Sequence, residues 1–208
     1  GYTRSFVKRF SITPKEYRKR QIAIPIFTQH PVNHYYILKE GQAMDTTTIC
    51  TVTPVNRPKR KLIYLTSKSA TDYLSYCEEV GCDWEGLLNS IHEKFDTAAL
   101  IDLPDSLQQK GISKIAAGVE VPIDYKKTLP DGYEVAELPE CVMLYFQSEP
   151  YDNPDDFGKY IGQVFKAIEN YNFERYGYKY ATSIAPTLNL GAEPEIGARI
   201  AIPVESIK

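Results

Sequence analysis

The sequence repeats itself at a spacing of 81 residues, and this duplication restricts the fold more than any other feature. Lys61–Leu65 (KLIYL) resembles Val142–Phe146 (VMLYF), and Val119–Ile123 (VEVPI) resembles Ile200–Val204 (IAIPV) at the same spacing. Blocks that share one offset indicate two copies of a single supersecondary unit. Between the blocks, apolar residues at helical spacing also correspond: Val80, Trp84 and Leu87 with Ile161, Phe165 and Ile168.

Each copy is predicted to contain a strand, a long helix and two further strands. β-branched and aromatic runs predict strands, and capping residues before periodic apolar segments predict helices. In the first copy the helix is expected over 70–94, interrupted near Gly81, with Ser69 and Asp72 as its capping box. In the second copy Asn153 caps the helix. The predicted strands are 46–53, 61–66, 98–103, 115–123, 133–138, 141–147, 180–190 and 196–204, and the second helix is expected to end near Tyr171.

The predicted fold class is therefore α+β, with tandem duplicated βαββ units related by a pseudo-twofold axis and a ligand groove between them. Because a helix covers one sheet face of each unit, we expect the groove on the opposite sheet faces. The first copy is expected over about 46–125 and the second over about 130–208. A short helical segment over 1–21 and a linker over 22–45 precede them.

Strand alternation selects candidate groove residues. If its two valine neighbours face the helices, Glu120 points to the opposite face, and its counterpart in the second copy is Ala201. A Glu at such a position meets solvent on an edge strand, a positive partner, or a ligand. Tyr64 and Tyr145 occupy equivalent strand positions and either line the groove or fill the core.

Charge is distributed unevenly along the chain. The first twenty residues hold seven Lys or Arg against one Glu, a net charge of +6, whereas the remainder carries −9. Phe6, Val7 and Phe10 form one apolar helical stripe, and Thr13 with Pro14 starts a second basic helix that is expected to run to about Gln21. Two short basic helices suit phosphate contacts, and they equally suit an ordinary solvated hairpin.

Other polar clusters are interpreted as structural. The four cysteines show no CxxC pair, so reduced thiols in a cytosol are expected; Cys77 and Cys82 have the spacing of a zinc ligand pair but lack a second pair nearby. His30 and His34 are interpreted as loop residues, and the acidic run after Tyr151 as a helix cap instead of a calcium loop. No apolar run approaches the ~20 residues that cross a bilayer, and no nucleotide-binding, serine-hydrolase or zinc-protease motif occurs.

The segment Ser5–Arg18 (SFVKRFSITPKEYR) closely resembles the end of the AraC-type helix-turn-helix domain. In that family an aromatic and basic recognition helix precedes a (G)-I-(T/S)-P-x-E-Y-R segment, whose usual Gly is Ser11 here. The resemblance covers only the last part of such a domain. It implies a C-terminal fragment of a cytoplasmic bacterial regulator that binds DNA as the full-length protein. The residues expected near DNA are Arg4, Lys8, Arg9, Lys15 and Arg18.

Residues of about 46–208 resemble the GyrI-like effector-binding domain. The resemblance is carried by Gly132–Pro139 (GYEVAELP), by Glu149–Tyr151 before a capped helix, and by Ile202–Val204. It implies a groove lined by aromatic residues that admits lipophilic, often cationic, small molecules, with no cofactor and no metal. Many members place a Glu on the penultimate strand, three residues after a Pro. Asn189 stands at that position here, so a charge for a cation would have to come from Glu120 or Glu195.

Three functions are consistent with these patterns. In the first, the chain is the small-molecule-sensing domain of an AraC-family regulator, with Glu120, Tyr64, Tyr145 and Asn189 binding the ligand. In the second, it is a GyrI-like hydrolase of strained electrophiles, with Glu120 as the only candidate base. In the third, the groove binds a protein partner. The first function is the one we predict, with no enzymatic activity.

Overall fold

The computed structural model describes residues 34–39, 47–129 and 131–207, together with isolated positions near the N-terminus (3, 4, 7, 13–15 and 19). The chain divides into two compact units, Gly1–Pro31 and Val32–Lys208. In the first unit Arg4 and Lys15 are exposed. Lys8, Arg9, Arg18 and most of the two predicted basic helices lie outside the described residues.

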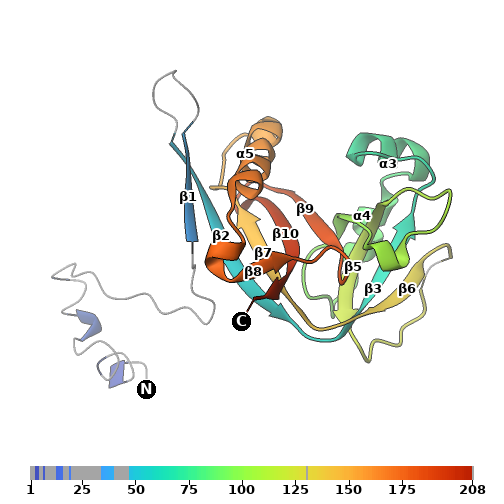
Figure 1. Cartoon of the computed structure of the whole chain (residues 1–208), viewed down its shortest axis with the longest axis horizontal. Coiled ribbons are helices and arrows are strands. Elements are labelled where there is room, and N and C mark those ends of the chain that lie inside the picture. Colours follow the sequence, from blue (N-terminus) through green and yellow to red (C-terminus); the bar gives the residue numbers. More distant parts are fainter. Residues whose placement is uncertain are drawn as a thin grey trace. The chain divides into compact units, whose positions relative to one another are not determined.

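The second unit is built on one ten-stranded sheet in which every pairing is antiparallel (Figure 1). The strand order is β1-β2-β7-β10-β9-β4-β5-β3-β6. The short strand β8 pairs with the C-terminal end of β10, beyond the part of β10 that pairs with β9. The strands are β1 (His34–Lys39), β2 (Thr47–Arg57), β3 (Arg60–Thr66), β4 (Ala99–Asp102), β5 (Ile115–Pro122), β6 (Glu134–Leu138), β7 (Cys141–Gln147), β8 (Tyr178–Tyr180), β9 (Thr187–Glu193) and β10 (Gly197–Ser206).

The first copy has two short helices, α3 (Tyr73–Val80) and α4 (Asp83–Asn89), with the interruption near Gly81 that was predicted. Gly81 separates them with φ +94°, a conformation that favours glycine. The α3 helix begins later than predicted because Asp72, not Ser69, is its N-cap: the Asp72 carboxylate accepts the Ser75 N–H, and the Ser75 hydroxyl accepts the Asp72 N–H.

The second copy has one continuous helix, α5 (Phe157–Asn170), after a 3₁₀ turn at Pro154–Asp156. The Asn153 side chain accepts the Asp155 N–H at 3.1 Å, which confirms the predicted cap. Two of the aligned helical residues are not core residues, because Leu87 is 40% exposed and Phe165 is 49% exposed. Further 3₁₀ turns lie at Asp105–Leu107 and Glu174–Tyr176.

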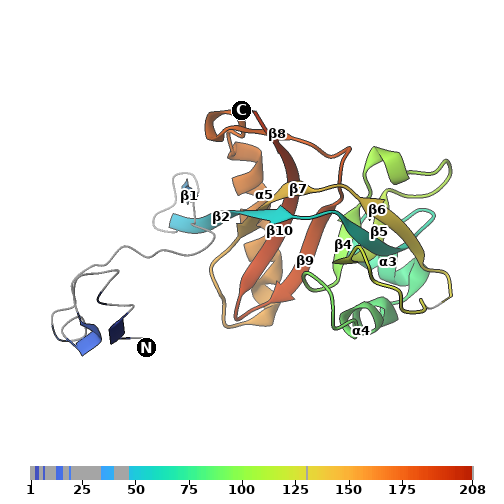
Figure 2. The ribbon, with the colours of Figure 1, turned by 90° about the horizontal axis from the view of Figure 1, so that it is seen from below.

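The strand order confirms the duplication and its pseudo-twofold arrangement. Outward from the centre of the sheet, β4-β5-β3-β6 mirrors β9-β10-β7-β2. Each βαββ unit supplies three of these strands, and the two outer strands are exchanged, since β2 pairs with β7 and β6 pairs with β3. The exchange lets β2 and β6 cross between the halves (Figure 2). Each exchanged strand thus takes its backbone partner from the other half.

Pairing registers correct one detail of the predicted repeat. Leu62 pairs with Glu120 in the first half, and Met143, which lies 81 residues after Leu62, pairs with Pro203. The counterpart of Glu120 is therefore Pro203, 83 residues later, and not Ala201. The offset lengthens by two because the chain between helix and last strand is longer in the second copy. A shift of two residues conserves the sheet face of every side chain.

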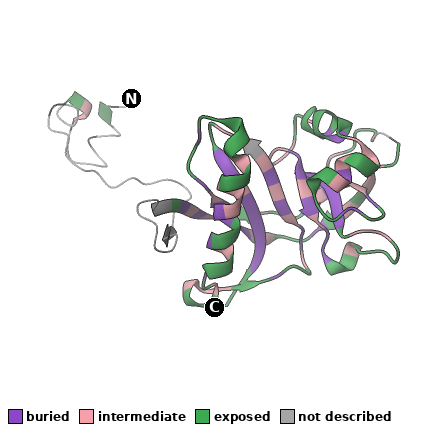
Figure 3. Ribbon diagram, turned by 90° about the horizontal axis from the view of Figure 1, so that it is seen from above, coloured by how far each residue is buried: buried purple, intermediate pink, exposed green. Residues whose placement is uncertain are grey.

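The two faces of the sheet are covered differently. On one face α5 packs over β2, β7 and β10, and α3 with α4 packs over β3 and β5 (Figure 3). On the opposite face, residues from both halves form a shared core that includes Leu62, Tyr64, Ile101, Met143 and Tyr145. The groove was predicted on this opposite face. The buried side chains of the shared core occupy that space, so the groove cannot lie there. We call these two surfaces the helix face and the core face.

Part of the predicted linker is a strand. β1 lies within 22–45 and pairs with β2 along six residues, so His34 is a strand residue and not a loop residue. His30 lies outside the described residues. Within the part of the chain that the structure describes, no helix is both long enough and apolar enough to span a membrane.

Candidate functional site

A groove of about 480 Å³ lies on the helix face, above the two central strands β4 and β9. Its walls come from both copies, because α3 and α4 contribute from one half and α5 from the other. Ligand sites in proteins typically occupy 300–1,000 Å³. The lining residues are Tyr73, Trp84, Glu85, Asn89, Thr97, Ala98, Leu100, Phe157, Asn189, Leu190, Gly191 and Glu193.

Aromatic side chains form much of the wall. Tyr73 and Trp84 meet edge to face, with ring centroids 6.5 Å apart, and Phe157 belongs to the other half. Trp84 is 4% exposed, and its indole N–H has no hydrogen-bond partner among the described residues. A buried, unpartnered donor costs free energy unless something outside the described chain accepts from it.

The floor contains Asn189, the residue of the penultimate strand that the GyrI-like resemblance implied as a ligand contact. Asn189 pairs with Leu100 across the centre of the sheet, and both face the helices. The Asn189 side-chain oxygen accepts the Gly191 N–H at 3.3 Å. Because its oxygen is engaged with its own strand, the side-chain NH₂ is the group with donors to offer a ligand.

A second amide shapes the wall beside the floor. The Asn89 side-chain oxygen accepts the Ala98 N–H and the Thr97 hydroxyl, both at 2.9 Å. These bonds tie the end of α4 to the segment that enters β4. Asn89 therefore holds two lining residues in place.

Charge in the groove is negative. Glu85 on α4 and Glu193 at the end of β9 line it, and no Lys or Arg does among the described residues. The Tyr73 hydroxyl donates to the Glu85 carboxylate at 2.9 Å. Desolvation, followed by this hydrogen bond, raises the pKa of Tyr73, so the phenol stays neutral. Carboxylates next to aromatic faces are suited to hold an organic cation.

The other three predicted ligand residues do not line this groove. Glu120, Tyr64 and Tyr145 lie on the core face, where they are 4%, 4% and 8% exposed. The Tyr64 hydroxyl donates to Glu134 at 3.2 Å. Burial raises the pKa of Tyr64 to about 12, and the Glu134 charge adds to the shift. Glu195, the other proposed counter-charge, is exposed and is not a lining residue.

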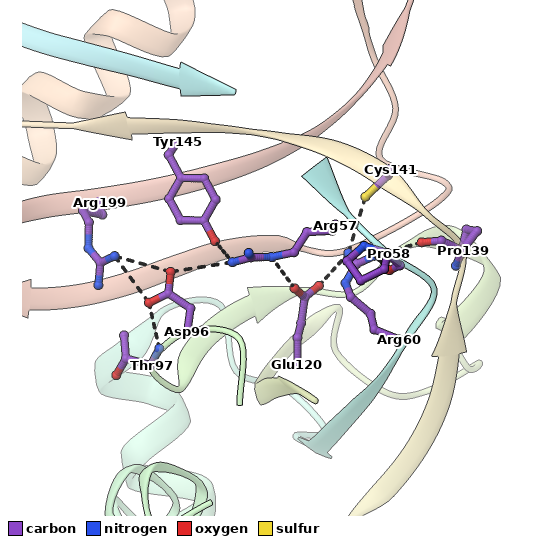
Figure 4. A network of polar contacts seen from close by, with 10 residues as sticks. All are labelled: Arg57, Pro58, Arg60, Asp96, Thr97, Glu120, Pro139, Cys141, Tyr145 and Arg199. Atoms are coloured by element: carbon purple, nitrogen blue, oxygen red, sulfur yellow. Dashed lines mark hydrogen bonds and ion pairs between the residues drawn. The ribbon is translucent and has the colours of Figure 1, made fainter. Parts of the chain in front are cut away.

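Glu120 lies in a buried network of ion pairs (Figure 4). One carboxylate oxygen is 2.6 Å from Arg60 Nη2 and the other is 3.3 Å from Arg57 Nε. The Arg60 side chain is fully buried, and it also donates to the Pro139 carbonyl at 2.8 Å. Arg57 donates to the Tyr145 hydroxyl, so Arg57 joins two of the predicted residues through one guanidinium. Glu120 thus has a positive partner, one of the three roles that the sequence left open.

The same network joins the halves and ends at the groove. Asp96, in the segment between α4 and β4, lies 3.3 Å from Arg199 on β10 and 3.8 Å from Arg57. The Asp96 carboxylate also accepts the N–H of Thr97, a groove-lining residue, at 2.8 Å. The network therefore links the two halves through ion pairs, and its member Asp96 is bonded to a residue of the groove wall.

Among the described residues no group of three His, Cys, Asp or Glu side chains is placed to hold a metal ion. The hydrolase hypothesis relied on Glu120 as a base in the groove. Its position in the ion-pair network on the other sheet face removes it from the groove, and both oxygens face guanidinium groups.

Sequence reasoning missed most of the groove residues. The periodic apolar pattern predicts Trp84 only as a core-facing helix residue, whereas it both packs in the core and lines the groove, and no sequence pattern marks Glu85. Alternation from Asn189 could not place Glu193, because the register of β9 against β10 shifts between them: Asn189 pairs with Ile200, whereas Ala192 pairs with Ala198. The missing information was which helix residues stand opposite that strand.

No family model and no curated protein matches this sequence. Similar solved structures include a candidate bacterial transcription regulation protein from Staphylococcus aureus MU50, at 16% identity and TM-score 0.42, covering 74% of this chain and 98% of that chain. SAV2435 bound to tetraphenylphosphonium is 14% identical, with TM-score 0.47 and coverage of 74% and 93%. An EcmrR–DNA complex is 12% identical, with TM-score 0.40, and the match spans 76% of this chain and 58% of that one. At these scores the similarities do not define a family for the chain.

Proposed function

We propose that this chain is the effector-binding part of a bacterial transcription regulator of the AraC type, and that the groove receives a lipophilic organic cation. The observation that carries the proposal is the lining of the groove: aromatic rings from both halves and two carboxylates, without a basic residue among the described lining. A ring face attracts a nearby cation, and a carboxylate adds the charge that Asn189 does not supply.

The position of the groove supports a sensing role. Its walls belong to two halves that are joined across the pseudo-twofold by exchanged strands. A ligand that contacts α4, α5, β4 and β9 together favours one arrangement of the halves over others. In the full-length regulator, a change in the halves would reach DNA through the basic segment that holds Arg4, Lys8, Arg9, Lys15 and Arg18.

The test uses Trp84, the only tryptophan of the chain, as a reporter inside the groove. The protein is titrated with tetraphenylphosphonium and, separately, with the isosteric anion tetraphenylborate, and Trp84 emission and heat are both recorded. The proposal predicts saturable binding of the cation with a change in Trp84 emission, and at least about tenfold weaker binding of the anion. Equal binding of both ions, or cation binding without an emission change, would contradict it.

A matched pair of variants locates the charge. Glu193→Gln should weaken cation binding by about three- to tenfold, because one carboxylate of the lining is lost. Glu195→Gln removes an exposed carboxylate two residues away, outside the lining, and should leave the affinity unchanged. The same loss in both variants would indicate a long-range charge effect and not a contact.

A further inference from the structure

One short segment of the chain belongs both to the groove and to the buried ion-pair network. We call residues 95–98 the wall segment. Thr97 and Ala98 line the groove. Asp96, the residue directly before them, pairs with Arg199 and Arg57 in the network (Figure 4). Adjacent residues of the wall segment therefore connect a ligand-facing wall to a set of ion pairs.

Three hydrogen bonds fix the wall segment to its own copy. The Phe95 N–H donates to the Glu120 carbonyl on β5 at 2.9 Å. The Thr97 hydroxyl and the Ala98 N–H both donate to the Asn89 side-chain oxygen at the end of α4, each at 2.9 Å. These bonds hold the wall segment against α4 and β5, which are elements of the first copy.

The link to the second copy is made by Asp96. Nη1 of Arg199, on β10, donates to both Asp96 carboxylate oxygens, at 3.3 and 3.4 Å. Because β9 lies between β4 and β10 in the sheet, this contact joins the wall segment to a strand that is not its neighbour. Arg57 lies farther from the same carboxylate, at 3.8 Å, and is shared with Glu120. Arg199 is therefore the closer cationic partner of Asp96.

The pair is largely shielded from solvent. The side chains of Asp96 and Arg199 are 22% and 13% exposed. An ion pair of similar length on the same strand pairing, Asp102 with Lys114 at 3.2 Å, is 45% and 60% exposed. Solvent screens an exposed pair, which holds its partners weakly, whereas a shielded pair holds them more firmly. The Asp96–Arg199 pair is thus suited to hold the wall segment in place.

We propose that Asp96 and Arg199 are positioning residues of the groove, and that their ion pair sets the affinity for the ligand. The proposal rests on the groove as the ligand site. With the pair intact, the walls from both copies are in place before the ligand arrives, so little conformational freedom is lost on binding. Without it, the wall segment relies on its bonds to the first copy and on the longer contact with Arg57, and the ligand has to order it.

Two substitutions separate positioning from charge. Asp96→Asn and Arg199→Gln each break the pair, and both variants are titrated with tetraphenylphosphonium by calorimetry. Positioning predicts that each variant binds the cation about three- to tenfold more weakly. A charge effect alone predicts opposite signs, because Asp96→Asn removes a negative charge near the cation and Arg199→Gln removes a positive one. Tighter or unchanged binding in a folded Arg199→Gln variant would overturn the proposal.

The double variant and a matched control complete the titration. If both residues act through one contact, the Asp96→Asn, Arg199→Gln double variant should bind as weakly as either single variant. Losses that multiply would show two independent effects and would contradict the proposal. Asp102→Asn breaks the exposed pair outside the groove lining and should change the affinity by less than about twofold. An equal loss in Asp102→Asn would also overturn the assignment.

Hydrogen exchange without any ligand tests the same link independently of what the groove binds. Peptides that contain residues 95–98 should exchange faster in Asp96→Asn and in Arg199→Gln than in the unsubstituted chain, with no such change in Asp102→Asn. Unchanged exchange, or a faster exchange spread evenly over the chain, would overturn the proposal. Faster exchange confined to this segment, in a chain that does not bind tetraphenylphosphonium, would support the positioning role and contradict the proposed function. Each variant gives this test alone where the other does not fold.

Discussion

Polar residues lie on both sides of the sheet, and the two sides differ in how they surround them. On the core face Glu120 is 4% exposed and sits between two arginine side chains, 2.6 and 3.3 Å away. On the helix face Asn189, Glu85 and Glu193 border open space. A polar residue in an apolar strand therefore indicates a site only where its neighbours leave it a free surface; with a guanidinium beside it, it is part of the core.

Burial explains the difference. Two ions removed from water cost several kcal/mol each, so the core face keeps them only as close ion pairs. The helix face avoids this cost because solvent reaches the groove carboxylates. The core face should accordingly respond to substitution with loss of stability, and the groove with loss of affinity.

The largest effect is expected for Glu120→Gln. The substitution retains the size of the side chain, leaves the fully buried Arg60 without its counter-charge, and leaves Arg57 with only Asp96, 3.8 Å away. The free energy of unfolding should fall by about 3–5 kcal/mol. Urea denaturation followed by circular dichroism measures it.

Glu137→Gln is the control for that substitution. Glu137 lies 2.7 Å from Lys59, as close as the buried pair, but both side chains are more than half exposed. The expected loss is below about 1 kcal/mol. Equal losses for Glu120→Gln and Glu137→Gln would show that burial does not distinguish the two pairs.

A smaller effect is expected for Gly118→Ala on the core face. A Cβ there would lie 2.8 Å from Ile101 Cδ1 and 3.3 Å from the Ile63 carbonyl oxygen, so neighbours must move. Overpacking of this kind costs about 1–3 kcal/mol.

On the helix face, the Cβ added by Gly86→Ala in α4 meets no atom within 4 Å, and the substitution should raise the free energy of unfolding by about 0.5–1 kcal/mol. Calorimetric melting of both variants gives the signs, and a stabilising Gly118→Ala would contradict a closely packed core face.

The smallest effect on stability is expected for Glu193→Gln. Its carboxylate lines the groove and belongs to none of the ion pairs observed among the described residues. The free energy of unfolding should change by less than about 0.5 kcal/mol. Urea denaturation of this variant beside Glu120→Gln compares one carboxylate of each face. A loss of several kcal/mol would show that the groove carboxylate is structural.

Local patterns predicted most of the elements, and the repeat predicted their pseudo-twofold arrangement, but nothing in the sequence predicted the exchange of the outer strands. The β7 strand, the Asn153 cap and the break at Gly81 follow from residues close in sequence. The exchange of β2 and β6 depends on contacts between the copies, which no local pattern contains. Alternation placed Glu120 and Asn189 on strands, yet it could not say which face is filled. Which face is filled depends on the packing of the two halves, which places Tyr64 and Tyr145 in one shared core.

The central claim is that the ligand site lies over β4 and β9 on the helix face, with Asn189 at its floor. The most direct measurement is calorimetric titration of Asn189→Glu with tetraphenylphosphonium. The account predicts about tenfold tighter binding than in the unsubstituted chain, because a carboxylate is added under the cation. Unchanged binding of the cation in a folded Asn189→Glu variant would contradict it and place the ligand elsewhere.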